Sequence, residues 1–121
     1  PQELQAEAMF AFARRHAADP DLDAAAIAAL FAVSPRTVHG RFAARQTALG
    51  RVLHDHRPDP ARRALENAAW ADQPISQVAY GCGFGDLSHF SKAFRARFGV
   101  APREWRTGLR PGRQSGAADA E

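Results

Sequence analysis

Apolar residues recur every three or four positions through most of the chain, which is the spacing of an amphipathic helix. No stretch alternates apolar and polar residues for long enough to predict a strand, so the fold class we predict is all-α. In the first helix we expect an apolar stripe made of Leu4, Ala8, Met9 and Phe12. The predicted helices cover approximately residues 3–18, 23–31, 35–44, 48–56, 60–70, 75–82 and 86–98, with a further helical turn at 102–106.

Polar residues and glycine mark the ends of these helices. Gly99 is typical of a helix C-terminus, and the polar, glycine-rich run beyond Thr107 predicts a disordered tail. The short segments 23–31 and 35–44, joined by a tight turn, predict a helix-turn-helix. The side chains expected to cap helix N-termini are those of Asp23, Ser34, Asp59 and Asp86.

The second half of the chain repeats the arrangement of the first. Buried and capping positions of the segment 35–44 recur 52 residues later in 86–98, while the preceding helices correspond at a separation of 51. The second turn is therefore one residue longer. The matched pairs are Ser34 with Asp86, Val38 with Phe90, Phe42 with Phe94, and Ile27 with Val78.

Each second helix of the repeat has one apolar side and one side of small, hydroxyl-bearing or basic residues. At about 100° per residue, Phe90, Phe94 and Phe98 share a side, which we interpret as core. A helix with such an outer side fits the DNA major groove, about 12 Å wide. The residues opposite the core are Arg36, Gly40 and Ala43 in the first copy, and Ser88, Lys92, Arg95 and Ala96 in the second.

Charge and cysteine content narrow the function classes. The net charge is +3, and basic residues concentrate in 34–57 and 92–113, the two regions that hold the second helices. A single cysteine excludes an internal disulfide and a cysteine-built zinc site. No apolar run approaches the roughly 20 residues of a membrane span. We expect a cytoplasmic, nucleoid-associated protein with no membrane partner.

The chain offers no catalytic constellation. His54 and His56 stand two apart on a predicted helix and point away from each other, so shared metal coordination is disfavoured. Cys82 lies in an apolar turn, where a buried inert thiol is favoured over a nucleophile. We predict no enzyme activity, no metal and no cofactor.

Two motifs resemble those of AraC/XylS-type transcriptional regulators. The pattern G-F-x-x-x-S-x-F-S-K-x-F-R-x-x-F-G-x-x-P-x-x-W-R, from Gly83 to Arg106, resembles the family signature, and Val33 to Phe42 is similar to the first recognition helix. The resemblance covers about residues 4 to 106. It implies the C-terminal DNA-binding domain of such a regulator, with double-stranded DNA as partner and an effector-binding domain outside this chain.

The resemblance also implies an architecture of two homeodomain-like helix-turn-helix subdomains, whose third and sixth helices enter successive major grooves. The predicted parts are residues 1–56, a linker helix at 57–72, residues 73–106 and the tail at 107–121. Pro58 and Pro60 predict a break in the linker helix, which departs from the family pattern. Gln46 stands where the family has a helix-ending glycine, so we expect a positive φ there.

Carried over by position, the resemblance predicts the DNA-binding residues. In the first recognition helix, Gly40 replaces a long side chain common in the family. Leu87 has two open readings, as a packing residue or as a contact to a thymine methyl group. The full predicted set is Arg36, Thr37, His39, Gly40, Arg41, Asp86, Leu87, Ser88, His89, Ser91, Lys92 and Arg95.

Two function classes remain open. The leading hypothesis is sequence-specific DNA binding for transcription regulation, with arginines anchoring phosphates and outward helix faces reading bases. The alternative is a protein-interaction module that docks on RNA polymerase or another partner and has only weak affinity for DNA.

Overall fold

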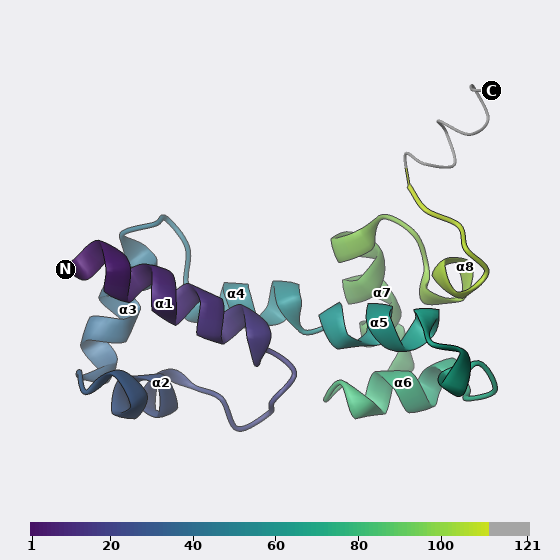
Figure 1. The fold of residues 1–121 in the computed structure, drawn as a ribbon, viewed down its shortest axis with the longest axis horizontal. Coiled ribbons are helices and arrows are strands. Elements are labelled where there is room, and N and C mark those ends of the chain that lie inside the picture. The colour runs from purple at the N-terminus through teal and green to yellow at the C-terminus, as the bar shows by residue number, and fades with distance from the viewer. Residues whose placement is uncertain (112–121) are drawn as a thin grey trace. The chain divides into compact units, whose positions relative to one another are not determined.

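The computed structural model describes residues 1–111, and within this range it contains helices and no strands. The all-α prediction is confirmed (Figure 1). The elements are α1 (Gln2–Arg15), α2 (Ala24–Phe31), α3 (Pro35–Ala43), α4 (Leu49–His56), α5 (Asp59–Glu66), the 3₁₀-helix η1 (Ala68–Trp70), α6 (Ile75–Gly81), α7 (Leu87–Phe98) and α8 (Pro102–Arg106).

The chain folds as two compact units, each with its own hydrophobic core. The first unit comprises residues 1–57, and the second begins at Pro58. Each unit contains one helix pair of the repeat, α2–α3 in the first and α6–α7 in the second. The helix α5, which begins between the two prolines and contains Pro60, belongs to the second core through Ala61 and Leu65.

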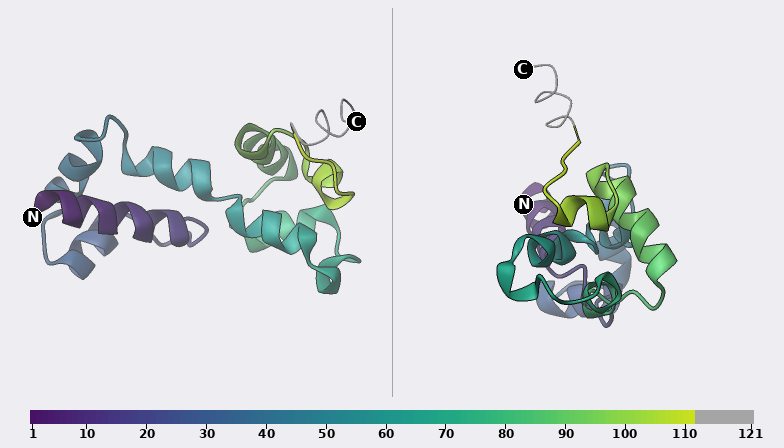
Figure 2. Two further views of the ribbon diagram at one scale, coloured as in Figure 1. Left: turned by 45° about the horizontal axis from the view of Figure 1, so that its top comes forward. Right: turned by 90° about the vertical axis from the view of Figure 1, so that its right-hand side faces the viewer.

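In the first unit, α1 packs against α3 and α4 (Figures 1 and 2). Its buried side consists of Ala6, Met9 and Ala13, whereas Leu4 is 69% exposed. The predicted stripe of α1 is therefore wrong except at Met9 and the half-buried Phe12. Small side chains such as alanine let a helix pack closely against its neighbours, so the side that carries them can be the buried one. In an alanine-rich helix, the largest apolar side chains therefore do not identify the buried side.

The two helix-turn-helix turns have the same backbone geometry. The N–H of Val33 donates to the carbonyl of Ala28 at 3.0 Å, and 51 residues later Phe84 donates to Ala79 at 3.1 Å. The residue before each donor has a positive φ, 57° at Ala32 and 87° at Gly83. The register of the repeat thus extends to the hydrogen bonds of the turns.

Gln46 has a φ of 61°, which confirms the expectation for this position. It follows α3, where the left-handed conformation ends the helix and would favour glycine. Its neighbour Thr47 donates its backbone N–H to the carbonyl of Phe42 at 3.3 Å.

The linker region differs from the prediction in two details. Asp59 is the first residue of α5 rather than its cap, and its carboxylate accepts a hydrogen bond from Arg97 Nε at 2.9 Å. The helix ends at Glu66 instead of continuing to residue 70. The cause is Asn67, which is extended and accepts a hydrogen bond from the N–H of Ala69 at 2.9 Å.

Order continues past Thr107, where the sequence predicted a disordered tail. The guanidinium of Arg110 lies 3.8 Å from the ring centroid of Trp105, and the N–H of Leu109 donates to the carbonyl of Glu104 at 3.0 Å. These two contacts hold residues that composition alone assigned to the tail. The rest of the predicted tail, residues 112–121, lies outside the described residues.

Candidate nucleic-acid interface

The first recognition helix, α3, is anchored by its buried side. Val38 and Phe42 are fully buried, and the ring of Phe42 stacks on Phe10 of α1 with centroids 4.4 Å apart. Ser34 caps the helix as predicted, since its Oγ accepts the N–H of Thr37 at 3.1 Å. This anchoring fixes which residues of α3 face outward.

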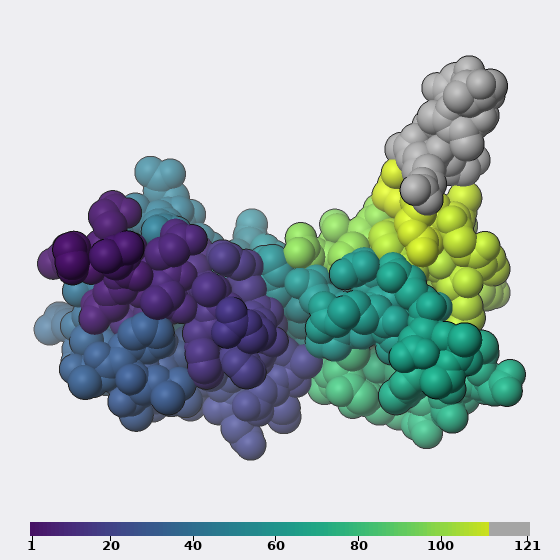
Figure 3. Space-filling view, in the orientation of Figure 1, coloured from purple at the N-terminus to yellow at the C-terminus, as the bar shows by residue number. Residues whose placement is uncertain are grey.

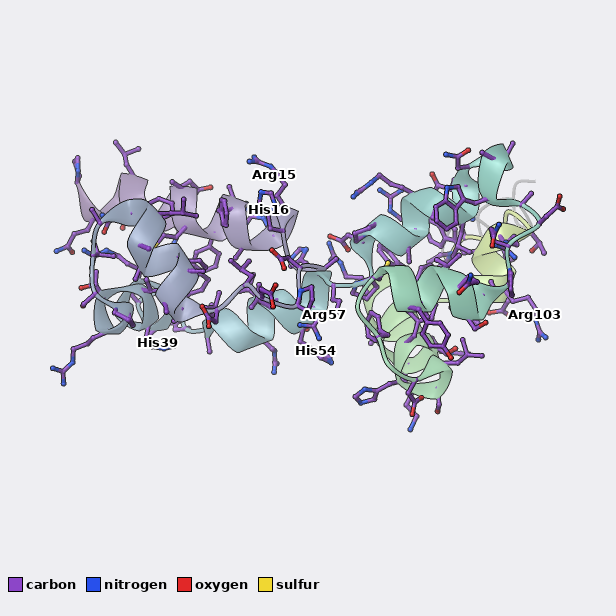
Figure 4. All side chains as sticks on the ribbon, turned by 90° about the horizontal axis from the view of Figure 1, so that it is seen from below. Arg15, His16, His39, His54, Arg57 and Arg103 are labelled. Carbon is purple, nitrogen blue, oxygen red and sulfur yellow. The ribbon has the colours of Figure 1, made fainter. Side chains whose placement is uncertain are left out.

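Three of the five predicted residues on α3 are exposed, namely Arg36, His39 and Gly40. His39 is labelled on α3 in Figure 4. Thr37 is half-buried, and its hydroxyl lies 3.1 Å from that of Ser34. Arg41 is also half-buried and donates from Nε to Gln5 Oε1 at 2.8 Å, so its head group contacts α1. The structure therefore places Arg36, His39 and Gly40 on the exposed surface of α3, whereas the head group of Arg41 contacts α1.

The second recognition helix, α7, rests on an aromatic cluster. Phe90 and Phe94 are fully buried, and Phe98 is half-buried. Trp105 of α8 contacts this helix, with its ring centroid 5.9 Å from that of Phe94 and 5.4 Å from that of Phe98. The space-filling view in Figure 3 shows this unit in teal to yellow. The phenylalanine ladder is core, as predicted.

The outward side of α7 carries most of the predicted residues. Ser88, His89, Lys92 and Arg95 are exposed, and Ser91 is half-buried. At about 100° per residue, the exposed side chains point away from the phenylalanine ladder, whereas Ser91 lies beside Phe98. The outward surface therefore carries hydroxyl groups and positive charge.

The first turn of α7 holds the other two predicted residues. Leu87 is 42% exposed, which leaves it accessible to a ligand. Asp86 caps the helix by accepting the N–H of His89 at 2.9 Å, so its carboxylate already has a structural role.

The basic side chains fall into paired and unpaired groups. Arg97 binds Asp59 at 2.9 Å, Arg62 binds Glu66 at 3.1 Å, and Arg45 binds Glu7 at 2.9 Å. Among residues 1–111, no carboxylate partner is found for the exposed cations Arg36, Lys92 and Arg95. These three are on the outward faces of α3 and α7, where a polyanion could meet them without displacing an ion pair.

Glu66 makes contacts with distant residues that the sequence analysis did not predict. Its Oε2 accepts a hydrogen bond from Trp105 Nε1 at 2.8 Å and lies 3.1 Å from Arg62 and 3.7 Å from Arg110. The hydrogen bond from Trp105, with the two arginines, lowers the pKa of Glu66. Glu66 thereby ties α5 to α8, which supports α7. A carboxylate 39 residues from its tryptophan partner leaves no local sequence signal.

Sequence reasoning also missed an exposed aromatic pair between η1 and α6. Trp70 is 41% exposed and Tyr80 is 53% exposed, and both line an open hollow of about 360 Å³ together with Gln73 and Gln77. Neither aromatic residue contributes to the core of the second unit.

The described residues contain no cluster of three or more His, Cys, Asp or Glu side chains that could hold a metal ion. Cys82 is buried, and burial raises the pKa of its thiol to about 11. It therefore stays protonated and unreactive at neutral pH. Within residues 1–111, every helix is too short or too polar to cross a membrane.

Sequence comparison connects the chain with regulatory proteins. A family described as "Helix-turn-helix domain" matches residues 27–108. The HTH-type transcriptional activator RhaS of Klebsiella pneumoniae (strain 342) is 40% identical over 84 residues, and RhaS of Escherichia fergusonii is 42% identical over 85 residues. These matches cover 68% and 69% of this chain but only 29% of each relative.

Two solved structures share the fold. One is a DNA-binding transcriptional dual regulator from Escherichia coli K-12, with a TM-score of 0.72 and 21% identity over 87% of this chain and 97% of that chain. The other is the C-terminal domain of AraT, a response regulator from Geobacillus stearothermophilus, with a TM-score of 0.65 and 21% identity over 88% of this chain and 86% of that chain.

Proposed function

The chain belongs to the AraC/XylS-type family of helix-turn-helix proteins, and on that premise we propose that it binds double-stranded DNA sequence-specifically to regulate transcription. The observation that carries the proposal is the position of three exposed cations that have no carboxylate partner among the described residues. Arg36, Lys92 and Arg95 project from the outward sides of two helices whose opposite sides are fixed by buried aromatic residues. Rigid helices with outward polar faces are suited to reading base edges.

The two recognition helices have different chemistry. Lys92 can bind the O6 and N7 acceptors of guanine, and Ser88 can donate to or accept from several bases. On α3, Arg36 can take the guanine role, whereas Gly40 contributes no side chain. We propose that α3 and α7 enter successive major grooves and that α7 supplies the larger share of base contacts.

The test is binding to a duplex selected from random sequences, compared with a scrambled duplex of equal length. The selected duplex should bind at least about 10³-fold more tightly at physiological salt. The variant Lys92→Ala should lose about 1–3 kcal/mol of discrimination at one base pair. Arg15→Ala is the matched control, because Arg15 is an exposed arginine at the end of α1 (Figure 4). This substitution removes one positive charge, as Lys92→Ala does. Equal affinity for both duplexes would refute the proposal.

The aromatic hollow favours a second role, docking of a protein partner such as RNA polymerase. Tryptophan and tyrosine are enriched among residues that dominate binding energy in interfaces. The double variant Trp70→Ala, Tyr80→Ala should then retain DNA affinity but lower transcription from a reporter promoter. Loss of DNA affinity in this variant would instead assign the hollow to folding or to DNA. An effector-binding domain and a nucleoid location stay predictions.

A further inference from the structure

Two arginines near the end of the first recognition helix contact α1 instead of pointing into solvent. Arg41 Nε donates to Gln5 Oε1 at 2.8 Å. Arg45 Nη2 lies 2.9 Å from Glu7 Oε1 and 3.9 Å from Glu3 Oε1. The guanidinium of Arg45 also lies 4.8 Å from the ring centroid of Phe10. Both arginines therefore have partners on α1.

These contacts surround a small hollow between α1 and α3. Its volume is about 140 Å³, and its lining includes Gln2, Glu3, Arg41 and Arg45. Two guanidinium groups at one hollow are suited to a phosphate, since arginine binds phosphate oxygens in a bidentate manner. In this structure Arg45 is instead paired with the carboxylates of Glu7 and of Glu3, of which Glu3 lines the hollow.

The exposure of the two glutamates indicates that a phosphate can replace them as partners of Arg45. The side chain of Arg45 is 32% exposed, whereas Glu7 is 61% and Glu3 is 93% exposed. Ion pairs with exposed partners are weak in water and are screened by salt. A carboxylate on α1 and a phosphate of DNA can therefore compete for the same guanidinium group.

We infer that Glu7, assisted by Glu3, competes with DNA phosphate for Arg45, so that α1 sets the affinity and the salt dependence of the first helix-turn-helix. The inference rests on the proposed DNA binding and adds an affinity determinant outside the recognition helices. Gln5 binds Arg41 through a neutral amide, which has no negative charge that could compete with a phosphate. Glu7 is therefore the residue that sets the affinity of this region for DNA.

The experiment compares Glu7→Gln with Asp21→Asn. Both substitutions remove one negative charge from an exposed residue of the first unit, but among residues 1–111 Asp21 has no cationic partner to release. Binding to a random-sequence duplex is measured between 50 and 200 mM salt. One added phosphate contact steepens the slope of log K against log salt by about 0.9, so the advantage of Glu7→Gln over Asp21→Asn should shrink about threefold across this range.

A second arm tests whether Arg45 carries the effect. Arg45→Ala should change the affinity little in the wild-type background and should abolish the gain in the Glu7→Gln background. Far-ultraviolet circular dichroism of each variant checks that the helices are retained. Equal slopes for Glu7→Gln and Asp21→Asn, or a gain that survives Arg45→Ala, would overturn the inference.

The outcome is separable from that of the proposed function, because the measurement uses duplex of random sequence. If the wild type binds selected and scrambled duplexes equally, sequence-specific function fails while the slopes still report on Glu7. If selected DNA is preferred and the slopes are equal, the competition fails and the proposed function stands.

Discussion

Replacing Gly40 by alanine should stabilise the first unit, because this glycine lies inside α3 without a local need for its flexibility. The residue is helical and exposed, and a Cβ placed on it meets no neighbouring atom within 4 Å. Glycine in a helix interior costs about 1 kcal/mol relative to alanine. Since the new methyl group neither clashes nor becomes buried, the whole backbone term should be recovered.

The expected size of the effect follows from the size of the unit. For a domain of roughly this length, about 1 kcal/mol corresponds to a rise in Tm of about 4–8 °C. In urea, with a slope near 1 kcal/mol per molar, the midpoint should rise by about 1 M. Affinity for DNA should change by less than the stability does, because a methyl group supplies no hydrogen bond.

The assay combines two probes of urea unfolding. Trp70 and Trp105 both belong to the second unit, so tryptophan fluorescence follows that unit, whereas circular dichroism at 222 nm follows helices of both. The later transition in Gly40→Ala should therefore be seen by circular dichroism. An unchanged or lower midpoint would refute the argument, since it would mean that the α3 backbone at residue 40 is not an ordinary helical conformation.

Two further predictions concern the second unit. The pKa of Glu66 is lowered by the hydrogen bond from Trp105, so this carboxylate stabilises the unit above its ordinary pKa of 4.5, and the contribution is lost as the pH falls through the lower folded value. Glu66→Gln should cost about 1 kcal/mol at pH 7 and should flatten the acid side of the stability profile; an unaltered profile would contradict this. Asp86→Ser should keep the cap of α7, and hence its stability within about 0.5 kcal/mol, while raising DNA affinity by removing a negative charge. Thermal unfolding tests the stability of this variant, and a binding assay tests its affinity for DNA. A lower affinity for DNA would show that the carboxylate itself takes part in recognition.

The sequence predicts the fold best where local chemistry decides the backbone. Ser34 and Asp86 cap their helices through side chains that reach only three residues ahead. The glycine terminus at Gly99 is likewise a local feature, whereas the positive φ of Gln46 follows from the resemblance to the family, which has a glycine at this position. Such positions can be inferred because the partners of each hydrogen bond lie within one turn of each other.

The sequence predicts contacts less well where the partner is distant in the chain. It also predicts the buried side of a helix less well where the apolar side chains of that helix are small and alike. Alanine-rich α1 has several apolar positions of similar size, so Leu4 was expected inside and is outside. Local sequence predicts that Asp59 caps a helix, whereas its carboxylate pairs with Arg97, 38 residues away. The same holds for Arg45, whose partners Glu3 and Glu7 lie about 40 residues earlier in the chain.

The two halves of the repeat differ in the part of the molecule that would meet DNA. Caps, turn hydrogen bonds and buried positions correspond between α2–α3 and α6–α7, because these features hold each helix pair together. The outer faces have no such constraint. Arg45 of the first unit pairs with Glu7 on α1, and Arg97, 52 residues later, pairs with Asp59 on α5, so this ion pair also recurs in both units. The outward residues differ instead, since α3 has Gly40 where α7 has Lys92. A duplication of this kind keeps two equivalent scaffolds and leaves their outward side chains free to differ, so we expect the two units to contribute unequally to DNA binding.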